Sequence, residues 1–474
     1  MKDYYLTKNF NTVRSILILY LINKHNKSLL EFKDKKYVWH PYTQMKIWNS
    51  QNNKIIRKGD NFYIIDQNKN KILDGISSMW SNVWGYGENP IVKAMKDQLS
   101  RLPNSTLFGL GNEPSTTLAE KLIRICKGMD KVFYSDNGST AIEIALKMSI
   151  QYWKNKTGNS KKHLFLSLRN GYHGDTIATM SVGYVNRFFE PYRPILLKTI
   201  HTQSPKDYEL RYESETDIVD KCLEMTERKL KKNSHQISAL IMESGAQIAG
   251  GVSIYPNSYQ KKIAELCKKY DVLLILDEIA TGFGRLGNMI EYIKQKSIPD
   301  IVCFGKALNG GYFPIAVTLT NNSIYRKFLG NYKDNKQFFH GHTYTGHPVG
   351  CAACIANIEL YKRKNLIRQI QKNSNHLKNK LSRFTKFKIV SKIRHKGLLV
   401  GIDLVDGKRK SLNFVKGIPI SHYIIRESLR RGIYLRTLGN TLTIIPPLAI
   451  PSNQLDVIID KCYEILDLLE KIKG

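Results

Sequence analysis

The sequence predicts an α/β protein in which helices cover a mostly parallel β-sheet, with a smaller α+β portion beside it. From about residue 90 onward, short apolar runs of strand length alternate with longer stretches of helical pattern. Strands that are apolar throughout are typical of parallel sheets, because helices bury both faces of such a sheet. With 474 residues, 42% of them hydrophobic, the chain can build a sizeable core and two closely packed domains.

The expected elements alternate in the order that a helix-covered sheet requires. The expected strands are the apolar runs at residues 132–135, 164–168, 239–243, 272–276 and 300–305. The helical patterns lie at 140–154, 256–270 and 285–296. We expect a large domain over 90–355 and a smaller domain built from 36–89 and 356–474. Because ligands bind beyond the carboxyl ends of the strands in such sheets, functional residues are expected directly after strands.

Residues 1–35 are expected to form an amino-terminal extension, either an amphipathic arm or an extraneous segment. Its apolar run at 15–22 is far shorter than the roughly 20 residues that span a bilayer. No small-residue cleavage site follows this run, and a signal peptide is kept as the alternative interpretation. We therefore expect no membrane partner and a cytoplasmic location.

The net charge and the cysteines limit which class of protein this can be. The chain carries 73 basic and 40 acidic residues, a formal net charge of +33, which can indicate nucleic-acid binding. Its lysines, however, are spread along the chain without a nucleic-acid motif, so we expect no nucleic-acid partner. A non-catalytic basic nucleic-acid-binding protein is the alternative from a different class. Seven widely spaced cysteines favour a reducing compartment, and Cys351 and Cys354 are expected to be buried on a helix.

The segment SDNGST at residues 135–140 joins an expected strand to an expected helix. Backbone N–H groups and the positive end of the helix dipole would point at one place there, which suits a phosphate group. Gly138 allows the turn, and hydroxyl side chains such as Ser139 follow it. Taken alone, the motif more often indicates simple helix capping, because Ser, Asp and Asn are common N-caps.

Two further residues stand at strand ends. Asp277 directly follows an apolar run, and its carboxylate could pair with a pyridinium nitrogen and hold it protonated, although a turn former is the plainer interpretation. Lys306 lies just beyond the next run, in a glycine-flanked turn. Most lysines are solvated surface charges. A semi-buried lysine has a lowered pKa, however, and a free amine can form an imine with an aldehyde.

A fourth motif, FFHGHTYTGHPVGCAA at residues 338–353, places Gly, His and Thr before a helix expected to start near Pro348. Such a donor-rich loop suits phosphate oxygens. Its three histidines, His340, His342 and His347, lack the i,i+4 spacing of common zinc motifs. We therefore expect no metal site.

Together these motifs resemble the class III branch of the fold-type I aminotransferases, from about residue 37 to the carboxyl end. The matching segments are Gly138-Ser139, Tyr172-His173-Gly174, Asp277-Glu278, Gly305-Lys306 and Gly341-His342-Thr343. The resemblance implies pyridoxal 5'-phosphate as the cofactor, carried by Lys306. It implies that Gly138 and Ser139 hold the phosphate, that Tyr172 stacks on the pyridine ring, and that Asp277 pairs with the ring nitrogen.

The same resemblance implies a homodimer with two shared sites. Thr343, with His342 beside it, would reach the cofactor phosphate of the neighbouring subunit, and Gly341 would border the substrate. The segment WHPYTQM at 39–45 resembles the biotin-pathway branch of the family, which aminates 8-amino-7-oxononanoate with S-adenosylmethionine as the amino donor. By this resemblance Tyr42 recognises substrate and donor, Trp80 joins Tyr172 in lining the substrate site beside Lys306, and Arg436 binds the substrate carboxylate.

Two departures from that branch leave the donor open. Met79 stands where members of that branch often have a second tryptophan beside Trp80, and His342 stands where some members have proline. A related branch uses lysine as donor, whereas Tyr42 favours S-adenosylmethionine. The nearest other expectation is a class III aminotransferase that acts on an ω-amino acid.

Overall fold

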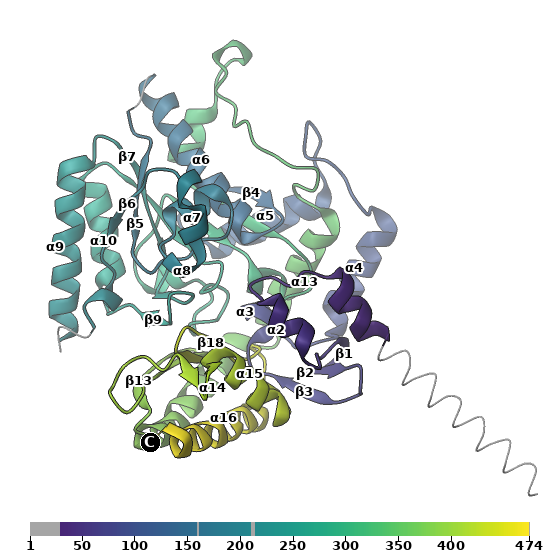
Figure 1. The fold of residues 1–474 in the computed structure, drawn as a ribbon. Helices are drawn as coiled ribbons and strands as arrows, with labels where there is room; N and C mark the ends of the chain where they lie inside the picture. The colour runs from purple at the N-terminus through teal and green to yellow at the C-terminus, as the bar shows by residue number, and fades with distance from the viewer. Residues whose placement is uncertain (1–28, 159–160, 210–213, 474) are drawn as a thin grey trace, which may run out of the picture.

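The computed structural model describes residues 29–158, 161–209 and 214–473, and Figure 1 shows its ribbon. A seven-stranded sheet forms the centre of the larger part. Its strand order is β4 (Lys131–Ser135), β12 (Ala316–Thr320), β11 (Ile301–Phe304), β10 (Leu273–Asp277), β7 (Ile237–Glu243), β5 (Leu164–Leu168) and β6 (Ile200–Thr202). Strand β12 runs antiparallel to both of its neighbours, while β11, β10, β7, β5 and β6 are paired in parallel. The predicted mostly parallel sheet is confirmed.

Helices bury both faces of this sheet. Successive residues of a strand point to opposite faces. Accordingly, Ile241 and Ile275 pack in one cluster with residues of α6 (Gly138–Thr157). Their neighbours Leu240 and Leu274 lie in a larger cluster with residues of α9 (Glu215–Asn233), α10 (Tyr259–Lys269) and α13 (Pro348–Arg363). This burial on two faces explains why the strands are apolar throughout.

Two smaller sheets complete the α+β part. The first has the order β1 (Ile56–Asp60), β2 (Tyr63–Asp66), β3 (Lys71–Asp74) and β17 (Ile433–Tyr434). The second has the order β13 (Val390–Lys396), β14 (Leu399–Leu404), β19 (Thr441–Ile444) and β18 (Arg436–Leu438). Because β17 pairs in parallel with β3, segments far apart in the chain share one sheet. The domain boundaries themselves remain a prediction.

The remaining elements connect or cover these sheets. The other α-helices are α2 (Met45–Ser50), α3 (Ser77–Trp80), α4 (Asn89–Arg101), α5 (Glu113–Ile125), α7 (Ile177–Val182), α8 (Asn186–Phe189), α11 (Glu291–Lys294), α12 (Asn322–Tyr325), α14 (Leu366–Leu381), α15 (Ile420–Arg430) and α16 (Ser452–Lys473). The short strands are β8 (Ala246–Gln247), β9 (Ser253–Ile254), β15 (Phe414–Val415) and β16 (Ile418–Pro419). The 3₁₀ turns are η1 (Glu190–Ile195), η2 (Pro205–Asp207), η3 (Lys306–Asn309), η4 (Arg326–Phe328), η5 (Tyr332–Asp334) and η6 (Ser382–Lys386). No helix in the described part of the chain is long and apolar enough to cross a membrane.

The helix predicted over 285–296 is wrong for most of its length. Only α11 is helical there, and the residues before it form turns in which Gly284 and Gly287 have positive φ angles of 97° and 94°. A helix cannot accommodate these angles, so glycine sets the local structure. The last described part of the extension predicted over 1–35, residues 29–35, belongs to a helix that ends at residue 37. The apolar run at 15–22 lies outside the described residues. Cys351 and Cys354 are buried on α13, as predicted.

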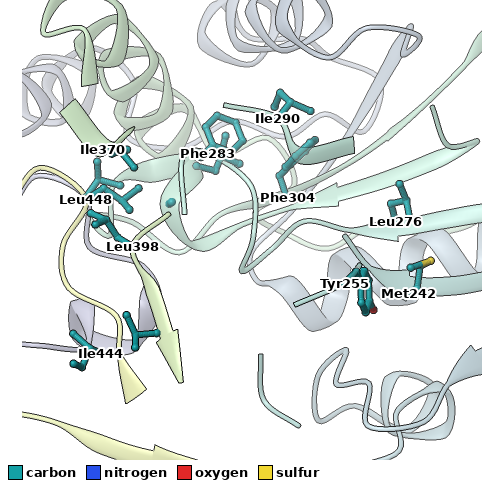
Figure 2. Packing of buried hydrophobic residues seen from close by; sticks show 14 of the residues in the cluster. Met242, Tyr255, Leu276, Phe283, Ile290, Phe304, Ile370, Leu398, Ile444 and Leu448 are labelled. Atoms are coloured by element: carbon teal, nitrogen blue, oxygen red, sulfur yellow. The ribbon is translucent and has the colours of Figure 1, made fainter. Parts of the chain in front are cut away.

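One continuous apolar cluster joins the large sheet to the carboxyl-terminal part. Figure 2 shows Phe283 between Phe304, which ends β11, and the side chains of Ile370 and Leu448. The rings of Phe283 and Phe304 meet edge to face, with centroids 5.4 Å apart. This packing fixes distant segments of the chain relative to the carboxyl ends of the strands of the large sheet.

Candidate active site

A cavity of about 460 Å³ lies beyond the carboxyl ends of β4, β5, β7 and β10. Six of the residues predicted for the site line it: Trp80, Gly138, Ser139, Tyr172, Asp277 and Lys306. They come from segments up to 226 positions apart in the chain, from 80 to 306. The fold therefore brings Trp80, Lys306, Asp277 and the start of one helix into a single space.

Lys306 follows β11 after one glycine, as predicted, and begins the turn η3. Its φ angle is +46°, a left-handed conformation that is uncommon for a residue with a side chain. Its Nζ lies 4.8 Å from the centre of the Trp80 ring. Burial lowers the pKa of the Lys306 amine, while the charges of Asp277 and Glu243 act to raise it. The net effect is a lowered pKa, which is the direction expected for a semi-buried lysine.

Asp277 is the last residue of β10 and is buried. Its Oδ2 atom lies 2.8 Å from Nδ1 of His173, which gives that ring nitrogen the proton in this contact. Its Oδ1 atom accepts a hydrogen bond of 3.0 Å from the backbone N–H of Ile279. The carboxylate is thus held in one orientation at the edge of the cavity.

Helix α6 begins at the cavity with Gly138 and Ser139. Asn137 caps the helix, because its side chain accepts a hydrogen bond of 3.0 Å from the backbone N–H of Thr140. A Cβ atom on Gly138 would lie 2.9 Å from the side chain of Ile279, and one on Gly174 would overlap the Ser139 hydroxyl. The start of α6 is therefore both capped and closely approached by backbone, so the capping and the phosphate interpretations are compatible.

Tyr42 is 60% exposed and lies at the edge of the site rather than in its wall. Its hydroxyl donates a hydrogen bond of 2.6 Å to Oδ1 of Asp175, three residues beyond Tyr172. Both tyrosine rings meet the ring of Phe188 edge to face, at 5.0 Å from Tyr42 and 6.4 Å from Tyr172. Aromatic side chains from two distant segments thus gather at one end of the cavity.

Five predicted site residues are not among the described residues that line this cavity: Tyr42, Gly341, His342, Thr343 and Arg436. Gly341 lies against the ring of Phe108, in a different loop. Arg436 lies on β18 and is partly buried.

Sequence reasoning did not assign three buried groups at the site. Glu243 ends an expected strand, so its position offered the same signal as Asp277. His173 stood inside a quoted motif, but its contact with Asp277 needs the fold. Arg285 donates to the backbone carbonyls of Leu398 and Pro446 and to the Ser77 hydroxyl, and no local pattern indicates such distant partners.

The family follows from comparison with known proteins. Residues 46–466 match the class-III aminotransferases. The chain belongs to the class-III aminotransferase family. Its cofactor is pyridoxal 5'-phosphate, and a solved amine transaminase from an uncultivated Pseudomonas species in a PLP-bound form is 30% identical, with a TM-score of 0.85 over 91% of this chain and 98% of that one.

Several relatives carry a more specific name. The adenosylmethionine-8-amino-7-oxononanoate aminotransferase of Methanocaldococcus jannaschii is 39% identical over 93% of this chain and 98% of its own length. Its crystal structure has a TM-score of 0.87, covering 93% of this chain and 99% of that one. The enzyme of the same name from Staphylococcus aureus is 40% identical over 91% of this chain and 95% of its own length. The chain is similar to these enzymes over nearly their whole length.

The residues around the cavity fit pyridoxal 5'-phosphate. The start of α6 offers backbone N–H groups and a close glycine approach, which a phosphate requires. Asp277 is a buried carboxylate fixed at a strand end, and Lys306 is an amine with a lowered pKa. These three groups match three polar parts of the cofactor, namely its phosphate, ring nitrogen and aldehyde.

Proposed function

We propose that the enzyme transfers an amino group from S-adenosylmethionine to 8-amino-7-oxononanoate and so forms the 7,8-diaminononanoate of biotin biosynthesis. The observation that carries the proposal is the placement of the Lys306 amine beside Trp80 and Asp277 in one cavity of a chain 39% identical to an enzyme named for this reaction. The segment WHPYTQM at residues 39–45, which includes Tyr42 and resembles the biotin-pathway branch of the family, supports the choice of substrate.

The cofactor supplies an electron sink that makes a proton on the α-carbon of the donor removable. Lys306 acts as the base that takes this proton at Nζ and returns it, because burial lowers its pKa and so favours the unprotonated amine more than in an exposed lysine. Asp277 provides the negative charge that stabilises a protonated ring nitrogen, and His173 keeps that carboxylate oriented. Tyr172 packs on one face of the ring.

Substrate recognition uses apolar and charged side chains. Trp80, Tyr42 and Tyr172 offer aromatic surface to a long aliphatic chain. Arg436 binds the carboxylate of the substrate, since a planar guanidinium forms two parallel hydrogen bonds with a carboxylate. Gly341 borders the substrate. Met79 and His342 differ from the pattern of the branch, and lysine is therefore the alternative donor.

The active form is a homodimer in which each subunit completes the site of the other. Phe108 is 64% exposed and lies against Gly341. Phe339, which belongs to the loop of Gly341, is also 64% exposed. Adjacent exposed aromatic side chains of this kind are typical of protein interfaces. Thr343 and His342, which follow in this loop, would then contact the cofactor phosphate of the neighbouring subunit. The seven cysteines are all free and buried, which supports a cytoplasmic location.

The test is to incubate the holoenzyme with 8-amino-7-oxononanoate and either S-adenosylmethionine or lysine, and to detect diaminononanoate by mass spectrometry. Product with S-adenosylmethionine supports the proposal, and product with lysine alone assigns the other donor. Lys306→Ala is the control that should give no product with either. Absence of product with both donors, together with turnover of an ω-amino acid, would refute the proposed substrate but not the family.

A further inference from the structure

Glu243 is a second acid at the edge of the cavity. It ends β7, and its register partner on β10 is Asp277, so two carboxylates stand side by side where the sheet ends. The side chain is only 5% exposed and borders the cavity. A buried carboxylate next to another acid is unfavourable in its ionised form. The groups that donate hydrogen bonds to it therefore indicate its structural role.

Each oxygen of Glu243 accepts a hydrogen bond from a different loop. Oε1 accepts one of 3.2 Å from the backbone N–H of Tyr172, in the loop after β5. Oε2 accepts one of 3.0 Å from the backbone N–H of Ile248, in the loop between β8 and β9. Ile248 is fully buried in an apolar cluster that also contains Trp80, so this second bond anchors the carboxylate to a packed part of the protein.

We propose that Glu243 is a positioning residue, which fixes the ring of Tyr172 against the cofactor by holding the Tyr172 backbone at the edge of the sheet. The inference rests on the proposed function, in which Tyr172 stacks on the cofactor ring. The acid does not touch the reacting atoms. It acts through the loop that carries Tyr172 and His173, and therefore also through the residue that orients Asp277.

Only a carboxylate satisfies both loops at once. Burial raises the pKa of Glu243 to about 7, so its ionised form prevails above that pH. An ionised carboxylate accepts hydrogen bonds at both oxygens, whereas a glutamine side chain accepts at its single oxygen and donates at its nitrogen. In Glu243→Gln one of the two backbone N–H groups therefore faces an amide N–H group. An unsatisfied buried donor is unfavourable, so the loop of Tyr172 or the loop of Ile248 moves away.

The experiment compares cofactor binding in the wild type and in Glu243→Gln. The apoproteins are titrated with pyridoxal 5'-phosphate by equilibrium dialysis, and the absorbance spectra of the holoproteins are recorded. We expect Glu243→Gln to raise the dissociation constant about tenfold or more, to shift the cofactor band, and to lower kcat with little change in KM for 8-amino-7-oxononanoate. If Glu243→Gln does not fold, Glu243→Asp, whose shorter side chain cannot reach both loops, should show the same losses.

Glu278→Gln is the matched control. Glu278 is also a fully buried acid with two backbone donors, the N–H groups of Glu291 and Tyr292, but it is not among the described residues that line the cavity. This variant should keep the cofactor spectrum and dissociation constant of the wild type. Equal losses in Glu278→Gln and Glu243→Gln would overturn the inference, because they would reflect a general cost of changing a buried acid.

A double variant tests the route through Tyr172. In a Tyr172→Ala background, Glu243→Gln should change the cofactor dissociation constant at least threefold less than it does in the wild type, because the ring it positions is gone. Fully additive losses would overturn the inference. A wild-type protein that binds no cofactor would refute the proposed function instead, and wild-type affinity and spectrum in Glu243→Gln would refute only the positioning role.

Discussion

Lys306 combines several local features at the cavity. It stands directly after a buried strand, has a left-handed backbone conformation and places its amine over the ring of Trp80. Strained conformations persist only where the surrounding structure enforces them, and they gather at functional sites. Burial lowers the pKa of the amine and so prepares it to take a proton or to react with an aldehyde.

Replacing this amine should remove activity without removing the fold. Lys306→Ala is expected to lower kcat by at least about a thousandfold, and Asp277→Asn by about a hundredfold or more, because proton transfer and ring charge depend on these groups. Turnover is measured beside circular dichroism, which should match the wild type. Borohydride treatment of the native holoprotein should fix the cofactor to Lys306. Labelling of another residue, or wild-type turnover in either variant, would contradict these roles.

Local sequence signals placed at the cavity the residues that stand at a strand end or a helix start. Asp277 and Gly138 belong to this group, since the apolar run beside each one marks the sheet edge. Glu243 had the same signal but no motif that singled it out. The partners of Arg285 are 113 and 161 positions away in the chain, and only the fold brings them together.

At the scale of elements, the site depends on how the loop after β5 meets the start of α6. Gly174 has a φ angle of +130° and lies so close to Ser139 that a side chain would overlap the serine hydroxyl. The strands and α6 could be predicted from their apolar patterns, whereas this contact between two loops has no periodic signal. The same limit explains the wrong helix at 285–296, where Gly284 and Gly287 fix a turn within a stretch of helical composition.

Gly174→Ala should therefore weaken cofactor binding more than it weakens the fold. The added methyl group pushes against Ser139 and adopts an unfavourable backbone angle, so the start of α6 shifts. We expect the dissociation constant of pyridoxal 5'-phosphate to rise about tenfold or more, as measured by dialysis. Gly158→Ala is the control, because this glycine also has a positive φ angle, +81°, but has open space around it. Equal effects on cofactor binding would contradict the role of the Gly174 contact.

At the scale of the whole molecule, the short helix that carries Trp80 into the cavity is joined to the carboxyl-terminal part of the chain, because Ser77 donates a hydrogen bond to the carbonyl of Ile445. Arg285 also spans this junction, because it donates hydrogen bonds to the carbonyls of Leu398 and Pro446 and to the hydroxyl of Ser77. Ser77 begins α3, the short helix that ends with Trp80. Burial lowers the pKa of Arg285 to about 10, so the guanidinium remains charged at neutral pH. The position of Trp80 over Lys306 thus depends on packing across the entire chain.

The shared sites of the proposed homodimer can be tested by mixing subunits. Lys306→Ala and Thr343→Ala should each be poorly active alone at low cofactor concentration. If Thr343 acts on the neighbouring subunit, a mixed dimer holds one site with both residues intact, and mixing should restore activity. Light scattering measures the dimer, and turnover after subunit exchange measures the complementation. A monomer in solution, or no recovery on mixing, would contradict the shared site.

The free energy of unfolding should fall as the pH rises from about 5 to about 8, because Glu278 is buried. Burial raises the pKa of this acid from 4.5 to about 8, although three hydrogen bonds to its carboxylate act in the opposite direction. Between these values the folded protein binds a proton that the unfolded chain has released, so the free energy of unfolding decreases with pH, by at most about 1.4 kcal/mol per unit for one group. The penalty is absent well below pH 4.5 and complete above about pH 8.

Glu278→Gln removes this titrating group and leaves the other buried acids in place. Urea unfolding of both proteins between pH 5 and 8 should therefore give a free-energy curve that falls less steeply for the variant. Burial lowers the pKa of His201 to about 4, so below about pH 6.5 this residue makes the free energy of unfolding rise with pH. His201 contributes equally to both proteins, and the difference between the two curves therefore reports Glu278 alone. Parallel curves would mean that Glu278 is ionised in the folded protein throughout this range. The hydrogen bonds from Glu291, Tyr292 and Ser244 would then outweigh the cost of its burial.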